Sequence, residues 1–136
     1  MVFPLNLGLQ KARLPLILVK MYDTDICLLL DTGSSVNLLD ERIFDYFQEI
    51  LPEIDLSQDT QKTVSLYGTS EGVRVNIPFT FENQEYNEPF ISSDLCPAAF
   101  DKISDETGMR IHGILGTNFL MKHEWVLDFK KMEVYS

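Results

Sequence analysis

The most regular pattern of apolar and polar residues lies in the middle of the chain. Over nine positions, apolar side chains alternate with polar residues or proline: Val73, Val75, Ile77, Phe79 and Phe81. This period of two predicts a strand with one buried face and one face in water. Together with residues 63–67 it predicts a hairpin whose turn is 68–72, and a second turn at 82–84 leads into a strand over 86–91.

Further apolar runs predict two more hairpins. Residues 14–20 and 26–30 flank a polar turn at 22–25, and residues 125–129 and 132–135 flank a pair of lysines. Short apolar segments bounded by polar turns are typical of strands. Strands therefore dominate the predicted structure.

A helix is predicted over residues 41–50, after a short strand at 36–39. Asp40 fits the N-cap position, because its carboxylate can accept a backbone N–H of the first turn. One face of this helix is apolar, formed by Ile43, Phe44, Phe47 and Ile50. Pro52 ends it, and one more helical turn is expected around 98–103.

Length and charge bound the class of protein. A chain of 136 residues with 45% hydrophobic residues is predicted to be one domain, 1–136, with a core of its own and without room for two lobes. The formal net charge is −10, and residues 40–106 hold fifteen Asp or Glu against four Lys or Arg. This balance argues against nucleic acid as a partner, because phosphate binding requires a basic face. We interpret it as a solvated acidic surface, with a preference for basic substrates as the alternative.

The cysteines and the first residues of the chain indicate the cellular compartment in which the protein is expected. Cys27 and Cys96 fit neither a disulfide framework nor a metal-ligand spacing, so free, reduced thiols are expected. The first nine residues are apolar but lack a basic n-region and are interrupted by Pro4 and Asn6, which argues against a signal peptide. No apolar run is long enough to span a bilayer. We expect a cytoplasmic protein without a membrane partner, unless a leader or anchor has been lost.

The stretch from Leu28 to Ser35 carries the clearest chemistry. An apolar run from Ile26 to Leu30 ends in Asp31, which is followed by Thr32 and Gly33. A carboxylate at the end of a buried strand is costly unless neighbouring groups donate hydrogen bonds to it. Gly33 and Ser34 supply backbone and hydroxyl donors within three residues. This pattern indicates a site and not a core position.

These residues resemble the active-site loop of the aspartic peptidases, in which Asp-Thr-Gly is followed by Ser or Ala between apolar residues. A second segment, His112 to Leu120, is similar to the other hallmark of that family: two apolar residues, a glycine and a short helix ending in an aromatic-leucine pair. Both segments occur once and in the expected order. The resemblance therefore spans nearly the whole chain.

Only one Asp-Thr-Gly loop is present, whereas the pepsin type carries two such loops in two lobes. The chain therefore resembles the retroviral type, in which a homodimer builds one shared site. The resemblance implies an all-β fold, a retropepsin-like closed or partly closed barrel with one or two short helices. It also implies an aspartic endopeptidase that acts without a metal or other cofactor on an extended peptide bound between the subunits.

The resemblance assigns roles to the residues around Asp31. The hydroxyl of Thr32 would bond across the dimer to the opposite loop, Gly33 would leave room for the substrate backbone, and Ser34 would donate to the outer oxygen of the carboxylate. The segment formed by Ile114, Leu115 and Gly116 would pack beneath the loop as a structural support.

The tip of the central hairpin predicted above resembles the flap that closes over the substrate of pepsin-type peptidases. Its candidate residues are Tyr67, Gly68 and Thr69, and the alternative is a surface hairpin whose tyrosine packs on a neighbour. The chain departs from the retroviral pattern in three ways: this flap is not rich in glycine, the 41–50 helix is an addition, and Thr117 stands where retroviral enzymes usually have an arginine that supports the dimer.

Other chemistries have less support. No Gly-x-Ser-x-Gly elbow surrounds Ser34 and Ser35, and His112 and His123 are not at metal-ligand spacing. Asp128 is interpreted as a strand-end or turn carboxylate. Two alternatives stay open: a non-catalytic retropepsin-fold module for dimerisation or peptide binding, and an enzyme restricted to its own precursor or one partner.

Overall fold

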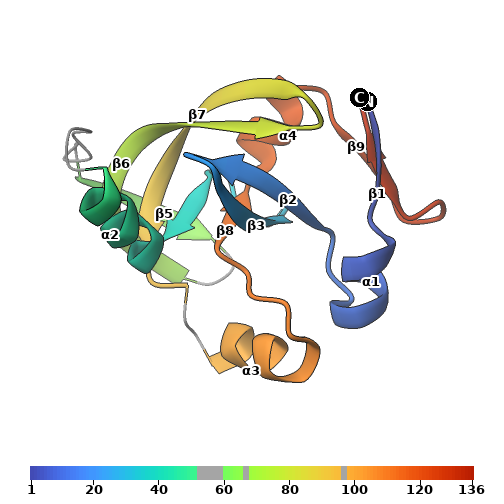
Figure 1. Cartoon of the computed structure of the whole chain (residues 1–136), viewed down its shortest axis with the longest axis horizontal. Helices are drawn as coiled ribbons and strands as arrows, with labels where there is room; N and C mark the ends of the chain where they lie inside the picture. The colour runs from blue at the N-terminus through green and yellow to red at the C-terminus, as the bar shows by residue number, and fades with distance from the viewer. Residues whose placement is uncertain (52–59, 66–67, 96–97) are drawn as a thin grey trace.

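A computed structural model describes residues 1–51, 60–65, 68–95 and 98–136 (Figure 1). Ten strands and four helices are assigned in these ranges. In chain order they are β1 (Val2–Pro4), α1 (Asn6–Ala12), β2 (Leu16–Met21), β3 (Thr24–Leu30), β4 (Leu38–Asp40), α2 (Glu41–Ile50), β5 (Thr60–Ser65), β6 (Gly68–Phe81), β7 (Gln84–Ser93), α3 (Ala98–Thr107), β8 (Gly113–Leu115), α4 (Thr117–Lys122), β9 (Val126–Asp128) and β10 (Glu133–Tyr135).

The expectation of a mostly β fold with a closed barrel is confirmed. The main sheet has the order β2-β3-β8-β4-β7-β6-β5, and Lys20 of β2 pairs with Thr80 of β6. This pairing closes six of the strands into a barrel, from which β5 extends along β6. Closure leaves few free edges on the sheet.

Strand β3 is covered on both faces from Ile26 to Leu30, whereas β2 is covered on both faces only at its start, because Leu18 and Lys20 are exposed. Ile17, Ile26 and Leu28 point into the barrel, whereas Leu16 and Leu29 belong to a second apolar cluster on the outer face. Residues paired directly across antiparallel strands share a face, which is why this alternation holds for both strands. Burial on both faces explains the uninterrupted apolar run that precedes Asp31.

A smaller sheet of β1, β10 and β9 joins the two ends of the chain (Figure 1). Val134, in the middle strand, is fully buried against the main core, together with Trp125 just before β9. In the described part of the chain, β1 and β9 are the outer strands of this sheet.

Helix α2 begins and ends where the sequence predicts. The Asp40 carboxylate accepts the backbone N–H of Arg42, and Phe44 and Phe47 are buried on its inner face. The expected number of helices is wrong, because four are assigned in the described ranges. Helix α3 is longer than the single turn expected, and α1 was not expected at all.

Helix α1 depends on tertiary contacts that the sequence pattern does not reveal. Leu5, which precedes it, is almost fully buried in the main core. Gly8 lies so close to the start of β2 that an added Cβ would stand 2.6 Å from the carbonyl oxygen of Leu14 and 3.0 Å from the Cβ of Leu16. An apolar run without helical periodicity therefore forms a short helix because it packs here.

The predicted turn of the central hairpin is also misplaced. Gly68 pairs with Ser65 and Thr69 pairs with Val64, so 68–72 is part of strand β6 and not a turn. Glycine and small polar residues were interpreted as turn formers, but pairing with β5 places them in a strand. The turns expected near Tyr22 and Asn83 are confirmed, with positive φ angles at both residues.

Across the described residues, none of the helices combines the length and the apolar character that a membrane crossing requires.

Candidate active site

Asp31 directly follows β3. Its backbone and its carboxylate make hydrogen bonds to different partners. Its backbone N–H donates to the carbonyl of Leu115 (2.9 Å). Its carboxylate oxygen Oδ1 accepts the backbone N–H of Gly33 (2.8 Å). The other oxygen, Oδ2, is buried and has no hydrogen-bond partner among the described residues. Such an oxygen is expected to bind another group, because burying an unpaired polar atom is costly.

The chain turns sharply after Asp31. The backbone N–H of Ser34 donates to the carbonyl of Asp31 (3.3 Å), and Thr117 donates to the carbonyl of Ser34 through its backbone N–H (2.8 Å) and its hydroxyl (3.0 Å). The hydroxyl of Ser34 donates to Val36 (2.7 Å). The expectation that Ser34 donates to the Asp31 carboxylate is therefore wrong, because the hydroxyl stabilises its own loop instead.

Strand β8 passes between the two strands that flank the Asp31 loop. It pairs parallel with β3, with Ile114 opposite Leu29, and antiparallel with β4, with Ile114 opposite Leu38. Ile114 and Leu115 are fully buried. Residues 76 and 85 positions apart in sequence are thus fixed side by side next to the loop.

Gly116 allows the closest contact in this arrangement. A Cβ at this position would stand 2.5 Å from the carbonyl oxygen of Val36 and 2.6 Å from that of Ser34. Both are backbone atoms, which cannot move without displacing the loop. Ile114, Leu115 and Gly116 thus lie where the sequence-based interpretation puts a structural support.

Asn37 was not recognised from the sequence, yet it holds the support and the loop together. Its side chain is almost fully buried. Oδ1 accepts the backbone N–H of Gly116 (3.0 Å), and Nδ2 donates to the carbonyl of Pro89 (3.1 Å). Its own carbonyl accepts the N–H of Ile91 (3.0 Å). The sequence shows only an asparagine directly before the apolar Leu38 and Leu39, and its burial depends on the fold.

Thr32 is exposed. It lines a shallow depression of about 400 Å³ together with residues of α4 and β9. Met121 is 77% exposed and Val126 is 43% exposed in this depression. We call this surface the loop-side face; its apolar members are Leu120, Met121, Trp125, Val126 and Leu127.

The flap residues are only partly described. Tyr67 lies outside the described residues, and Gly68 and Thr69 form the beginning of β6. Their assignment to a flap stays a prediction.

The two histidines have structural partners. Nδ1 of His112 accepts the backbone N–H of Cys27 (3.0 Å), and burial, assisted by Arg110, lowers the pKa of this imidazole. Nε2 of His123 lies 2.7 Å from the buried carboxylate of Glu88, which also binds Lys122. Within the described ranges, no group of His, Cys, Asp and Glu could hold a metal ion.

Two smaller predictions concern Asp128 and the cysteines. The Asp128 carboxylate accepts the backbone N–H groups of Lys130 and Lys131 (3.0 Å each), which confirms that it stabilises a turn. Cys27 is a free, buried thiol, and burial raises its pKa to about 11. Cys96 lies outside the described residues.

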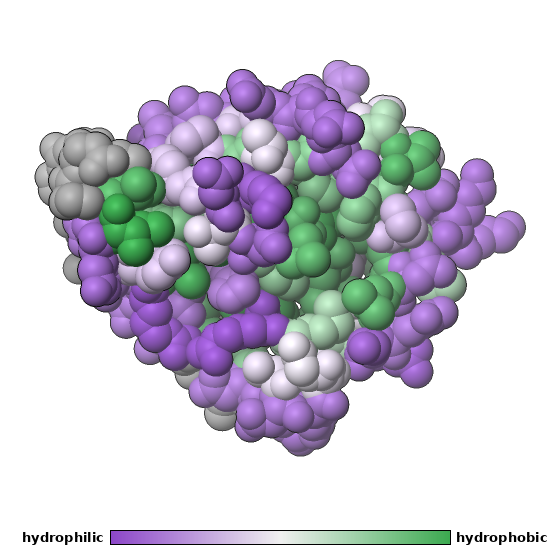
Figure 2. Space-filling view, viewed as in Figure 1, coloured by the Kyte–Doolittle hydropathy of each residue, from purple (hydrophilic) through white to green (hydrophobic). Residues whose placement is uncertain are grey.

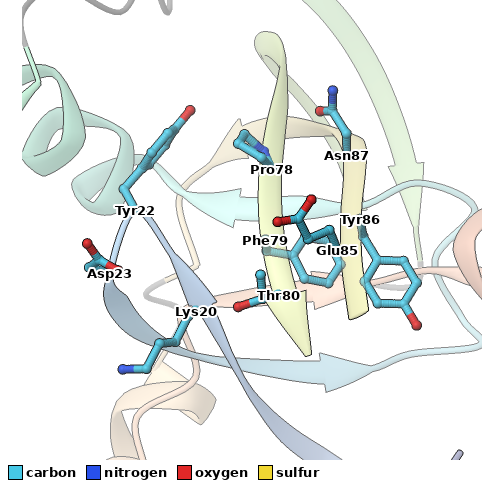
Figure 3. Close-up of a pocket in the computed structure, with 9 residues that line it drawn as sticks. All are labelled: Lys20, Tyr22, Asp23, Pro78, Phe79, Thr80, Glu85, Tyr86 and Asn87. Carbon is cyan, nitrogen blue, oxygen red and sulfur yellow. The ribbon is translucent and has the colours of Figure 1, made fainter. Parts of the chain in front are cut away.

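A pocket of about 600 Å³ lies at the opposite end of β3 from Asp31 (Figure 3). Tyr22 and Asp23 approach it from the β2–β3 turn, and Glu85 from β7. Asp23 and Glu85 are exposed, so water solvates their charges. None of the predicted site residues lines this pocket.

A scan against protein-family models found no match, and a search of curated proteins found none either. The candidate site therefore rests on the Asp31 loop and its supports.

Proposed function

We propose that the protein is an aspartic endopeptidase that acts as a homodimer, with one Asp31 from each subunit in a single site. The observation that carries this proposal is the state of the carboxylate. One oxygen is fixed by Gly33, while the other is buried without a partner in the described chain. A second carboxylate and a bound water, supplied across a dimer, would give that oxygen its partners.

The proposed reaction is hydrolysis of a peptide bond by an activated water. Two carboxylates held this close share one proton, as is known of aspartic peptidases in general, because both cannot ionise together. The ionised Asp31 would accept a proton from the water, whose oxygen attacks the carbonyl carbon. The protonated Asp31 would donate to the carbonyl oxygen. Collapse of the tetrahedral intermediate breaks the C–N bond as a proton passes to the leaving amine, and no cofactor is needed.

The loop-side face supports the dimer. It joins the exposed Thr32 to an exposed apolar surface on α4 and β9. In the described sheet β9 is an outer strand, so its backbone is available to pair with another copy. A twofold axis beside Thr32 would bring the two loops together, as an isologous interface requires.

The substrate would be an extended peptide bound in a groove between the subunits. An extended chain presents its backbone for hydrogen bonds and its side chains to pockets on alternating sides. The fold alone does not establish this activity, because a barrel of this kind can also bind without cutting. Catalysis is favoured here because a buried, unpaired carboxylate oxygen destabilises the protein and has no use in a simple binding module.

The test is cleavage of a peptide mixture from acid to neutral pH by the wild type, Asp31→Asn and Asp25→Asn. Asp25 is the matched control, because it lies near the other end of β3 and is exposed. The wild type and Asp25→Asn should cleave the same peptides, and Asp31→Asn should lose at least 99% of the activity. Equal cleavage by all three would refute the mechanism. Binding of peptides without cleavage by the wild type would establish the non-catalytic alternative.

Sedimentation at several concentrations tests the dimer separately. A monomer–dimer equilibrium is expected, with cleavage rate following the dimer fraction. A strictly monomeric protein that still cleaves would contradict the shared site.

A further inference from the structure

Glu88 is a charged residue on a face of β7 that is otherwise apolar. Side chains alternate along a strand, so Glu88 shares its face with Tyr86 and Phe90, and it is paired with Ile77 of β6. These three neighbours belong to the main core. Figure 2 shows mostly hydrophilic surface over the β6–β7 hairpin, yet Glu88 is only 3% exposed. A carboxylate buried in this way needs cations or hydrogen-bond donors, because its burial without them is costly.

Glu88 binds two residues at the C-terminal end of α4, which lies beside the β6–β7 hairpin (Figure 1). Nζ of Lys122 lies 3.1 Å from Oε1 and 3.3 Å from Oε2 of the carboxylate. Nε2 of His123 lies 2.7 Å from Oε1. The His123 ring also packs on Tyr86 and Phe119, with centroid distances of 5.0 Å and 4.5 Å. The carboxylate thus fixes this end of α4 on the barrel.

The other end of α4 is bound to the Asp31 loop. Thr117, the first residue of the helix, donates to the carbonyl of Ser34 through its backbone N–H (2.8 Å) and its hydroxyl (3.0 Å). The helix has only six residues and is therefore about 9 Å long. Rigid elements of secondary structure carry coupling between separate sites. One short helix therefore connects Glu88 with the loop that holds Asp31.

Stability alone is a weak reason for this buried charge. Replacing a buried ion pair with apolar residues of similar volume is often neutral or stabilising. Because the neighbours of Glu88 on this face are apolar or aromatic, an apolar residue would fit the pattern of the strand. A carboxylate with two directional partners adds a defined orientation of the helix, which apolar contacts specify less strictly.

We infer that Glu88 is a positioning residue of the proposed peptidase, which holds α4 in the orientation in which Thr117 aligns the Asp31 loop. The inference rests on the proposed function. Glu88 acts through Lys122 and His123 and takes no part in the chemistry. Weakening its contacts should therefore loosen the bond between Thr117 and Ser34 and slow the catalytic step.

The experiment compares the wild type with Glu88→Gln, Lys122→Met and Lys122→Arg by hydrogen exchange and by cleavage kinetics. Gln keeps the shape of Glu without its charge. Lys122→Met removes the cation from a side chain that is 60% exposed, and Lys122→Arg keeps a cation there. Glu85→Gln is the matched control, because Glu85 is an exposed glutamate on the same strand.

In Glu88→Gln and Lys122→Met the backbone N–H of Thr117 should exchange about tenfold faster or more, because a charge-assisted contact is lost. The N–H of His112, which donates to the carbonyl of Cys27 (2.9 Å) in the barrel, should be affected much less. At concentrations where sedimentation shows only dimer, kcat should fall about tenfold or more while KM stays nearly constant. Lys122→Arg and Glu85→Gln should match the wild type in both measurements.

Three results would overturn the inference while leaving the proposed function intact. Equal acceleration of the Thr117 and His112 amides would show only a general loss of stability. Unchanged exchange at Thr117 in Glu88→Gln would show that the carboxylate does not hold the helix. Full kcat in the dimeric Glu88→Gln variant would show that the loop does not need this contact. A wild type that cleaves nothing would instead reject the proposed function, and the role of Glu88 with it, whatever the exchange rates are.

Discussion

Replacing Asn37 tests whether one buried amide connects the Asp31 loop to its support. The side chain is 1% exposed and makes hydrogen bonds to Gly116 and Pro89, which belong to different parts of the barrel. In Asn37→Ala the N–H of Gly116 and the carbonyl of Pro89 lose these partners. An unsatisfied buried group costs about 1–3 kcal/mol. For the two groups together we expect the free energy of unfolding to fall by about 2–6 kcal/mol.

Asn37→Asp provides a sharper form of the same test, because the two side chains have nearly the same shape. A protonated carboxyl can accept from Gly116 and donate to Pro89, whereas the ionised form places a charge against the Pro89 carbonyl. Burial of that charge raises the pKa of the introduced carboxyl above its unfolded value of about 3.9. The variant should therefore approach wild-type stability below pH 3.9 and lose stability as pH rises from there to the folded pKa.

Urea unfolding measures both effects. Trp125 is the single tryptophan and is buried, so its fluorescence reports the loss of the core. Asn76→Ala is the control, since Asn76 is an exposed asparagine on β6. The slope of free energy against urea should stay constant in all variants. A loss below about 1 kcal/mol in Asn37→Ala, or a loss in Asn37→Asp that is the same at every pH, would refute the reasoning.

Three further predictions concern Gly116, Met121 and His112. Gly116→Ala should destabilise the protein by about 1–3 kcal/mol or more in urea unfolding, because its Cβ meets the Ser34 carbonyl at 2.6 Å; wild-type stability would contradict this packing. Met121→Glu should weaken dimerisation at least tenfold in sedimentation without changing the melting temperature, and unchanged association would exclude the loop-side face. The pKa of His112 is lowered from 6.5, so the free energy of unfolding falls as the pH drops below 6.5. His112→Gln should reduce the slope of that free energy against pH by up to about 1.4 kcal/mol per pH unit. An unchanged slope would contradict this prediction.

Local patterns were enough to predict much of the barrel. The alternation in β6, the N-cap at Asp40 and the apolar run before Asp31 each act within a few residues, and each corresponds to an observed element. Helix α1 and the first part of β6 were missed for a common reason. Their residues have weak or contrary local preferences, and packing or strand pairing decides their conformation.

The candidate site also combines contacts that the local sequence specifies with contacts that depend on the whole fold. The bond between Gly33 and the Asp31 carboxylate spans two residues, so the sequence alone suggests it. The bond between Asn37 and Gly116 spans 79 residues and depends on β8 lying between β3 and β4. Nothing in the residues around Asn37 specifies that partner. The chemistry of this site is therefore encoded locally, while its rigidity depends on long-range contacts, and a substitution at Asn37 separates the two.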